Sequence, residues 1–95
     1  MTNDESSIVY DEAGNRFSYS SDQGTGVLKF RRDYTRIYFL HTEVSEGLRG
    51  QGVGAKLAKA GLEFARANKL RVIAQCPFVR KYIMEHAQYQ DLVEV

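Results

Sequence analysis

The sequence changes its hydrophobic period once, at the glycine-rich segment Arg49-Gly50-Gln51-Gly52-Val53-Gly54. Before this segment, apolar residues alternate in short runs separated by turn residues, which indicates β-strands. After it, apolar residues recur every three or four positions, which indicates an amphipathic helix. Unpaired backbone N–H groups collect at the start of a helix, so a glycine turn at this junction constrains both the fold and the class of ligand.

The first half of the chain predicts an antiparallel meander. Strands are expected at residues 8–10, 16–20, 27–31 and 35–44, where β-branched and aromatic residues are frequent. Turn residues separate these runs at 13–15, 23–26 and 33–34. Residues 10–44 are therefore occupied by strands and tight turns.

The second half predicts a helix from Val53 to about Asn68, a short buried strand at 71–74 and a second helix. Pro77 is expected to open that helix, which would end near residue 85, because proline is favoured at the first helical position. Strand, helix and strand in this order predict a crossover to a parallel neighbour. The fold class is therefore α/β with a mixed sheet, an antiparallel meander followed by a β-α-β-α unit.

Two finer expectations concern the C-terminal part of the chain. The spacing of Val79, Ile83 and Ala87 predicts that these residues face the core. Residues 92–95 are expected to add a last short strand.

Length and composition bound the remaining possibilities. Ninety-five residues suffice for one domain, expected at 7–95, with a disordered tail at 1–6. No apolar run approaches the roughly 20 residues of a membrane span, and the N-terminus lacks the pattern of a signal peptide. The single cysteine, Cys76, excludes an internal disulfide and a multi-cysteine metal site. A soluble cytoplasmic protein without a metal, either a monomer or a weak dimer, is expected.

Charge is distributed unevenly along the chain. Residues 49–81 contain eight Lys and Arg against one acidic residue, Glu63, whereas residues 1–48 contain five Lys and Arg against eight Asp and Glu. A basic block around a glycine turn suits a polyphosphate ligand. The alternative is a solvated helix face with a few loop cations. Nucleic acid is disfavoured, because the block lacks interleaved aromatic residues and any reader motif.

Two common phosphate-binding motifs do not fit the glycine turn. A Walker P-loop ends in Gly-Lys-Ser or Gly-Lys-Thr, but Val53 follows Gly52 here. A dinucleotide fingerprint requires an acidic residue about twenty positions later, where this chain has residues 71–75 and no acid.

The turn at 49–54 matches the Q/R-x-x-G-x-G/A signature of the GNAT acetyltransferase superfamily, at a strand-to-helix junction. Leu40-His41-Thr42-Glu43-Val44 and the segment 75–82 resemble the small YjdJ-type branch of that superfamily, and the similarity runs from about Ile8 to Val95. The resemblance implies a GNAT-like fold with a splayed parallel strand pair. Larger members of that superfamily carry two helices between their first and second strands, and the strands and tight turns expected at residues 10–44 leave no room for them.

The resemblance further implies an N-acetyltransferase that moves an acetyl group from acetyl-CoA to an amine. The backbone of Thr42, Glu43 and Val44 would bond the pantetheine arm. The pyrophosphate would lie on the amides of the turn, formed by Arg49, Gly50, Gln51, Gly52, Val53 and Gly54. Additional phosphate contacts are expected from Lys56, Arg80 and Lys81, with ordinary surface cations as the alternative.

Three residues are candidates for the chemistry. Cys76 precedes Pro77 and so occupies a helix N-cap at a strand end, a placement typical of reactive cysteines, although a lone cysteine is also typical of a buried core. His41 at the end of the central strand is expected near Cys76. His41 would act as a base with Cys76 as an acid toward the CoA sulfur, or Cys76 would act as a nucleophile; we favour direct transfer. Tyr82 would protonate the sulfur, as a tyrosine does in larger relatives, or would pack against the sheet.

The missing helices bear on the acceptor. Without them the acceptor side is expected to be open, which suits a peptide, a protein terminus or a lysine, unless a partner chain supplies the wall. Two competing functions remain: a non-catalytic module that binds acyl-CoA or another protein, and a small nucleic-acid binder.

Overall fold

The computed structural model describes residues 8–94, and the predicted tail at 1–6 lies outside this range. The five strands of one sheet follow each other in sequence order: β1 (Val9–Asp11), β2 (Arg16–Ser21), β3 (Gly24–Arg32), β4 (Arg36–Val44) and β5 (Arg71–Ala74). The first four are antiparallel, and β5 runs parallel to β4. The predicted mixed sheet is confirmed.

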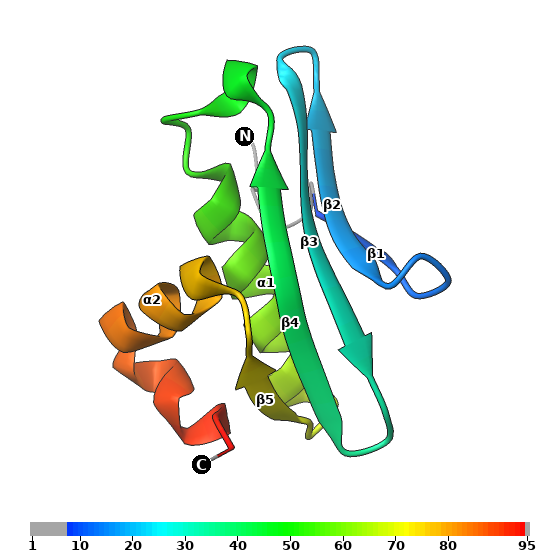
Figure 1. Ribbon diagram of the computed structural model, residues 1–95, viewed down its shortest axis with the longest axis vertical. Coiled ribbons are helices and arrows are strands. Elements are labelled where there is room, and N and C mark those ends of the chain that lie inside the picture. The colour runs from blue at the N-terminus through cyan, green and yellow to red at the C-terminus, as the bar shows by residue number, and fades with distance from the viewer. Residues whose placement is uncertain (1–7, 95) are drawn as a thin grey trace.

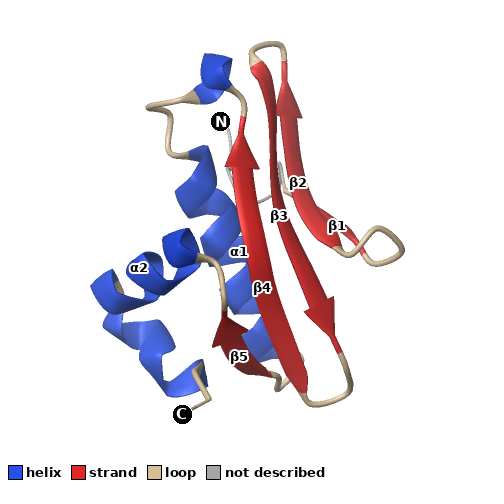
Figure 2. Cartoon of the chain, viewed as in Figure 1, coloured by secondary structure: helices blue, strands red, loops and turns tan. Residues whose placement is uncertain are grey.

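Two α-helices and two short 3₁₀ helices complete the chain: η2 (Glu46–Leu48), α1 (Val53–Ala67), α2 (Pro77–Glu85) and η3 (Ala87–Leu92). No helix lies between β1 and β4 in the described range, so the early helices of larger relatives are absent there, as predicted. Figure 1 shows α1 lying behind the strands, and Figure 2 shows strands on one side of the molecule and helices on the other. None of the helices between residues 8 and 94 is both long and apolar enough to cross a bilayer.

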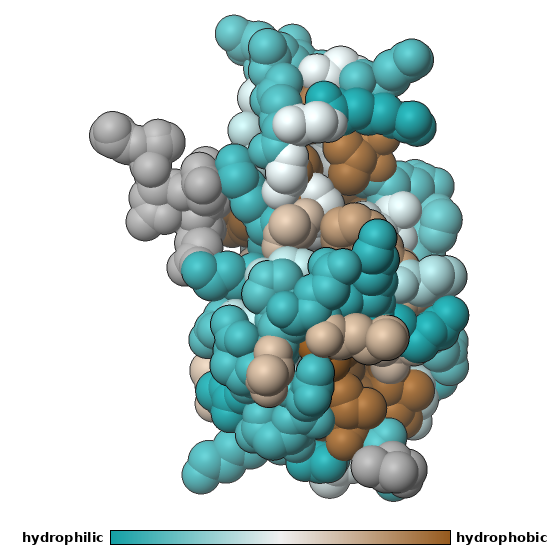
Figure 3. Space-filling model, turned by 90° about the vertical axis from the view of Figure 1, so that its left-hand side faces the viewer, coloured by the Kyte–Doolittle hydropathy of each residue, from teal (hydrophilic) through white to brown (hydrophobic). Residues whose placement is uncertain are grey.

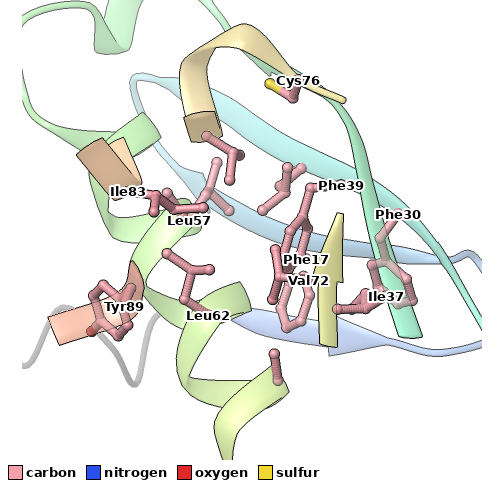
Figure 4. Packing of buried hydrophobic residues seen from close by; sticks show 14 of the residues in the cluster. Phe17, Phe30, Ile37, Phe39, Leu57, Leu62, Val72, Cys76, Ile83 and Tyr89 are labelled. Atoms are coloured by element: carbon pink, nitrogen blue, oxygen red, sulfur yellow. The ribbon is translucent and has the colours of Figure 1, made fainter. Parts of the chain in front are cut away.

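The core lies between one face of the sheet and α1. Leu28, Phe30, Ile37 and Phe39 are at most 2% exposed and meet the apolar stripe of the helix. Gly61 allows the close approach, because a Cβ there would lie 2.8 Å from the Phe39 ring. Figure 4 shows this packing, with Cys76 above Phe39 and Ile83 of α2 directed toward Leu57 of α1.

The second helix begins at Pro77 as predicted, and Val79 and Ile83 are buried. The prediction for Ala87 is wrong: this residue is exposed, because α2 ends at Glu85 and a 3₁₀ helix with a different period follows. Tyr89 and Leu92 of η3 are buried in its place. The Tyr89 hydroxyl donates a hydrogen bond of 2.6 Å to Glu63 of α1, which holds η3 against that helix.

The strand predicted at 92–95 does not form over its described part, 92–94, and residue 95 lies outside the described range. Leu92 belongs to η3, and the segment meets β5 through a single bridge between Val93 and Val72. The Glu94 N–H donates to the Val72 carbonyl at 3.0 Å, and the Glu94 carboxylate pairs with Arg36 at 2.9 Å. After η3 the chain reaches the edge strand β5 at Val93 only, so a single bridge forms and not a ladder of paired residues.

Candidate functional site

The parallel strand pair opens into a fork. β4 and β5 pair over four residues, and the last pair joins Phe39 to Ala74. The Phe39 carbonyl accepts two hydrogen bonds of 2.9 Å, from the N–H groups of Gln75 and Cys76. β5 then leaves the sheet toward α2, whereas β4 continues to Val44. Within residues 8–94, the last part of β4 therefore has a free edge facing the gap (Figure 1).

A β-bulge sets the direction of the backbone along this free edge. Phe30 pairs with Phe39 but Lys29 pairs with His41, so Leu40 is an extra residue in β4. Beyond the bulge the Ser45 N–H donates to Thr25 of β3 at 2.9 Å. Because alternate residues of a strand direct their N–H and C=O groups to opposite sides, those of Thr42 and Val44 face the gap. These two residues can bond an extended ligand.

The glycine turn leaves a set of amides without acceptors at the start of α1. Gly52 is the N-cap in a left-handed conformation (φ 76°), and the first helical bond is donated by Lys56 to its carbonyl. In the described range, no acceptor contacts the N–H groups of Gly50 and 52–55. The N–H groups of Arg49 and Gln51 bond inside the turn, to Glu46 and Leu48. Four of the six residues predicted to bind the pyrophosphate thus have N–H groups without an acceptor: Gly50, Gly52, Val53 and Gly54. Ala55 provides a fifth such N–H group.

The turn borders a groove of about 330 Å³, lined by residues 48–50 and 52–55 together with Val44 and Phe78. A Cβ at Gly50 or Gly52 would meet no atom within 4 Å, so both glycines leave open space in front of the amides. Figure 3 views the molecule from the side of α2. It shows brown, apolar atoms in a hollow below the upper end of the molecule. The groove joins the free edge of β4 to the start of α1.

Phe78 is a groove residue that the sequence did not single out. The residue is 42% exposed, and a Cβ on Gly54 would lie 2.9 Å from its ring. Gly54 therefore makes room for this ring as well as lining the groove. An exposed aromatic residue directly after the proline at a helix start is the signal that could have identified it.

Cys76 lies at the branch of the fork. It is the N-cap of α2 as expected, but its sulfur makes no capping hydrogen bond. The side chain is turned inward and is 3% exposed. Its sulfur lies 3.2 Å from Oγ1 of Thr42, so thiol and hydroxyl share a hydrogen bond across the gap between β5 and β4.

His41 lies on the other face of the sheet. It pairs with Lys29, whereas Thr42 pairs with the buried Leu28 on the helix face. The imidazole Nε2 lies 3.0 Å from Oε2 of Glu43, and both side chains are more than half exposed. The structure therefore does not bring His41 and Cys76 together, because the two side chains project from opposite faces of the sheet.

Tyr82 points toward the C-terminal side of α2. Its ring stacks on His86 with centroids 3.9 Å apart and lies 6.1 Å from the ring of Tyr89. This cluster adjoins α1 through the bond between Tyr89 and Glu63. Tyr82 is half-buried, as expected if it packs against neighbouring side chains instead of protonating the CoA sulfur.

The predicted phosphate-binding cations differ in what they contact. Arg80 donates hydrogen bonds of 3.1 Å to the carbonyls of Ala74 and Gln75, so it supports the turn after β5. The Lys56 ammonium lies 5.8 Å from the centre of the Tyr19 ring. Arg49 and Lys81 are exposed, and Arg49 also lines the groove.

The chain resembles proteins of one family. The family model described as GCN5-related N-acetyl-transferase matches residues 16–92. Protein NATD1 from Gallus gallus is 39% identical over 52 residues, which are 55% of this chain and 47% of NATD1. Protein NATD1 from Danio rerio is 34% identical over 55 residues, which are 56% of this chain and 50% of NATD1. The chain thus spans about half the length of the curated relatives it matches.

A solved structure agrees over a larger part of the chain. The NMR solution structure of a GCN5-like protein from Staphylococcus aureus superposes with a TM-score of 0.70 at 37% sequence identity, covering 92% of this chain and 86% of that one. The fold is that of a GNAT-type domain. The chain belongs to the GCN5-related N-acetyltransferase family.

Proposed function

We propose that this chain transfers the acetyl group of acetyl-CoA to an amine. One observation carries the proposal: the fork between β4 and β5 opens directly beside the unpaired amides at the start of α1. A CoA thioester is a long ligand with a diphosphate at one end and an extended amide-containing arm at the other. The groove offers partners for both parts in one continuous path.

The residues present fit this ligand. The amides of Gly50 and 52–55 would hold the diphosphate, since free N–H groups and the helix dipole favour an anion and the glycines leave the approach open. The backbone of Thr42 and Val44 would bond the pantetheine arm along the free edge of β4. Arg49 lies at the mouth of the groove, where its charge favours phosphate. When bound, acetyl-CoA supplies an activated acetyl thioester.

The chain's own groups would support transfer in the gap. A backbone N–H of Thr42 or Val44 would stabilise negative charge on the carbonyl oxygen of the acetyl group. The Cys76 thiol, oriented by Thr42, would give a proton to the departing CoA sulfur in a direct transfer. Tyr82 faces His86 and is assigned to packing.

The sheet face that points away from α1 indicates how an acceptor would approach. In the described range, no helix covers the face of β2, β3 and β4 that points away from α1. Lys29, Arg31 and Glu43 on that face are exposed. An acceptor that approaches over an open sheet surface is best supplied by a peptide or a protein rather than by an enclosed small amine.

The experiment compares ligands by thermal shift and then measures transfer. CoA and acetyl-CoA should each raise Tm, whereas ATP and NAD at equal concentration should not. Acetyl-CoA with peptides that carry one lysine or a free N-terminus should give an acetylated product by mass spectrometry. Equal shifts with ATP and CoA would contradict the assignment of the ligand. A CoA shift without transfer to any peptide would identify a non-catalytic acyl-CoA-binding module instead.

A further inference from the structure

The turn between β2 and β3 packs against the segment that leads from β4 to the amide cradle, the set of N–H groups of Gly50 and 52–55. Figure 1 shows this turn beside η2 at the upper end of the sheet. A Cβ at Gly47 of η2 would collide with the backbone oxygen of Gln23, and a Cβ at Gly24 would collide with the Ser45 hydroxyl. Glycine at these two positions therefore allows the turn and the segment to meet.

Ser45 joins the end of β4 to Thr25 of β3 by three hydrogen bonds. Its N–H and its hydroxyl both donate to the Thr25 carbonyl, at 2.9 and 2.8 Å, and its hydroxyl oxygen accepts from the Thr25 N–H at 2.7 Å. In a regular antiparallel pair the Thr25 N–H would donate to the Ser45 carbonyl instead. The serine hydroxyl thus replaces a backbone acceptor, as short polar side chains can do.

The Ser45 carbonyl is consequently available to start the next turn. It accepts from the Leu48 N–H at 2.9 Å, which forms η2. The two bonds inside the glycine turn follow, donated by the N–H groups of Arg49 at 3.1 Å and Gln51 at 3.2 Å, and the chain then reaches the left-handed Gly52. Since each turn begins within the one before it, the direction in which the chain leaves β4 determines where the cradle lies.

The hydroxyl of Ser45 serves this junction and not the helix. Ser45 is the N-cap of η2, a position where serine commonly bonds a helix N–H, but its side chain makes no capping bond. Both the donor and the acceptor of the hydroxyl are used on Thr25. The side chain therefore fixes the segment after β4 to β3.

The same stretch of β3 also meets the far end of the segment. A Cβ at Gly26 would lie 2.8 Å from Cγ1 of Val53, the first residue of α1, which is 2% exposed. The segment 45–53 is thus held at one end by Thr25 and at the other by Gly26. A segment held at both ends loses less conformational freedom when a ligand binds.

We propose that Ser45 is a positioning residue for the CoA thioester, and that the turn between β2 and β3 acts through it to set the geometry of the amide cradle. This inference rests on the proposed function, in which the cradle holds the diphosphate. Ser45 is not one of the described residues that line the groove, so it acts on the ligand through the segment it anchors. Donors held in the geometry of the bound state bind more tightly, because less ordering is left to occur on binding.

The test uses the chain of residues 1–95 with Ser45→Ala and Ser45→Thr, and with Ser20→Ala as the matched control. Ser20 is exposed on β2 and pairs with Thr25 from the other side, so its removal deletes a hydroxyl from the same row of the sheet, two strands away from β4. Kd for CoA is measured by calorimetry at 25 °C. Tm, kcat and KM are measured as well, with acetyl-CoA and a peptide that carries one lysine.

Ser45→Ala should raise Kd for CoA and KM for acetyl-CoA about tenfold. It should leave kcat at saturating acetyl-CoA, and KM for the peptide, within about twofold, because the loss concerns binding alone. Ser45→Thr should restore Kd, since threonine keeps the hydroxyl and suits the extended backbone of this position (φ −65°, ψ 154°). Ser20→Ala should match the unsubstituted chain.

Gly47→Ala tests the same contact from the side of η2. Gly47 is not among the described glycines with positive φ, so alanine adds no backbone strain there and the collision with Gln23 accounts for the effect. Because the turn and the segment must move apart, Kd for CoA should rise at least about tenfold, as expected when binding groups are displaced by a fraction of an ångström. At 25 °C the folded chain should retain its kcat.

Two patterns of results would overturn the proposal. If Ser45→Ala and Gly47→Ala lower Tm but leave Kd for CoA unchanged, both residues support the fold and not the cradle. If Ser45→Thr binds CoA as weakly as Ser45→Ala, or if KM for the peptide rises together with KM for acetyl-CoA, the hydroxyl does not position the cradle. Failure of the proposed function has a different signature, since the unsubstituted chain would then bind no CoA or acetylate no peptide.

Discussion

Gly52 provides the sharpest test of the amide cradle, because its two structural roles predict effects of different size. The residue caps α1 at φ 76° and ψ 18°, a left-handed conformation that glycine adopts freely. Alanine in this conformation costs about 1–2 kcal/mol. For a domain of this length, each kcal/mol lowers Tm by about 4–8 °C, so Gly52→Ala should lose roughly 4–16 °C. Gly52→Asn should lose less, because asparagine tolerates the left-handed region.

A side chain at Gly52 would also weaken ligand binding. A Cβ at Gly52 meets no atom within 4 Å, so it causes no clash in the ligand-free chain and obstructs only a ligand. CoA at a hundred times its Kd stabilises the folded state by about 2.7 kcal/mol, or roughly 10–20 °C for this domain size. If the side chain weakens binding about a hundredfold, the same concentration equals Kd, and the shift falls to about 0.4 kcal/mol, or roughly 2–3 °C.

The assay is thermal unfolding of Gly52→Ala, Gly52→Asn and the unsubstituted chain, with and without CoA. Ala67→Gly is the matched control, because it destabilises the far end of α1, by at most about 1 kcal/mol, without touching the groove. The control should keep the full CoA shift, and both Gly52 variants should lose most of it. If Gly52→Asn keeps the shift of the unsubstituted chain, the diphosphate does not lie on these amides and the reasoning fails.

Three further predictions concern stability and chemistry. Lys69 has φ 57°, so Lys69→Gly should relieve the strain and raise Tm by about 4–8 °C; an unchanged Tm would contradict this reading of the end of α1. Hydrogen bonds donated by Arg66 lower the pKa of Asp91 below its ordinary 3.8, so their stabilising contribution is present above that pH and is lost as pH falls through the lowered pKa. Asp91→Asn should therefore flatten the fall of Tm with pH below about 4, and an unaltered slope would count against the ion pair. Direct transfer predicts that intact-mass measurement with acetyl-CoA and no acceptor shows no adduct on Cys76, and that Cys76→Ser lowers kcat about a hundredfold; a labile acetyl adduct would identify a nucleophile.

The sequence determined the order and type of the main elements. Alternating apolar residues, the change of period after the glycine turn and the proline at the start of α2 are signals carried by neighbouring residues, so they could be read without a structure. The amide cradle was predictable for the same reason, because it is made by one continuous segment, 49–55. Which of its N–H groups lack an acceptor was not predictable, because Arg49 and Gln51 donate theirs to carbonyls inside the turn.

The C-terminal segment shows where local signals end. Residues 87–94 have no clear period, and their path is set by contacts with distant residues. Tyr89 bonds to Glu63, Arg66 pairs with Asp91, and Arg36 pairs with Glu94. These pairs join positions 25 to 58 residues apart. A buried Ala87 was a reasonable expectation from its helical spacing, and a short strand from the residue types, but long-range packing produced a 3₁₀ helix instead.

The relation between the candidate catalytic residues was decided by tertiary structure alone. The sequence gives no reason to place the side chains of His41 and Cys76 on opposite faces of the sheet, since both residues lie near the ends of neighbouring strands. The bulge at Leu40 exists only because β4 pairs with β3 in that register, and it places His41 on one face and Thr42 on the other. A one-residue offset in a strand reverses the face of every side chain beyond it. The sequence therefore determines which residue types are present at the site. The face of the sheet on which each side chain lies depends on strand pairing between distant segments.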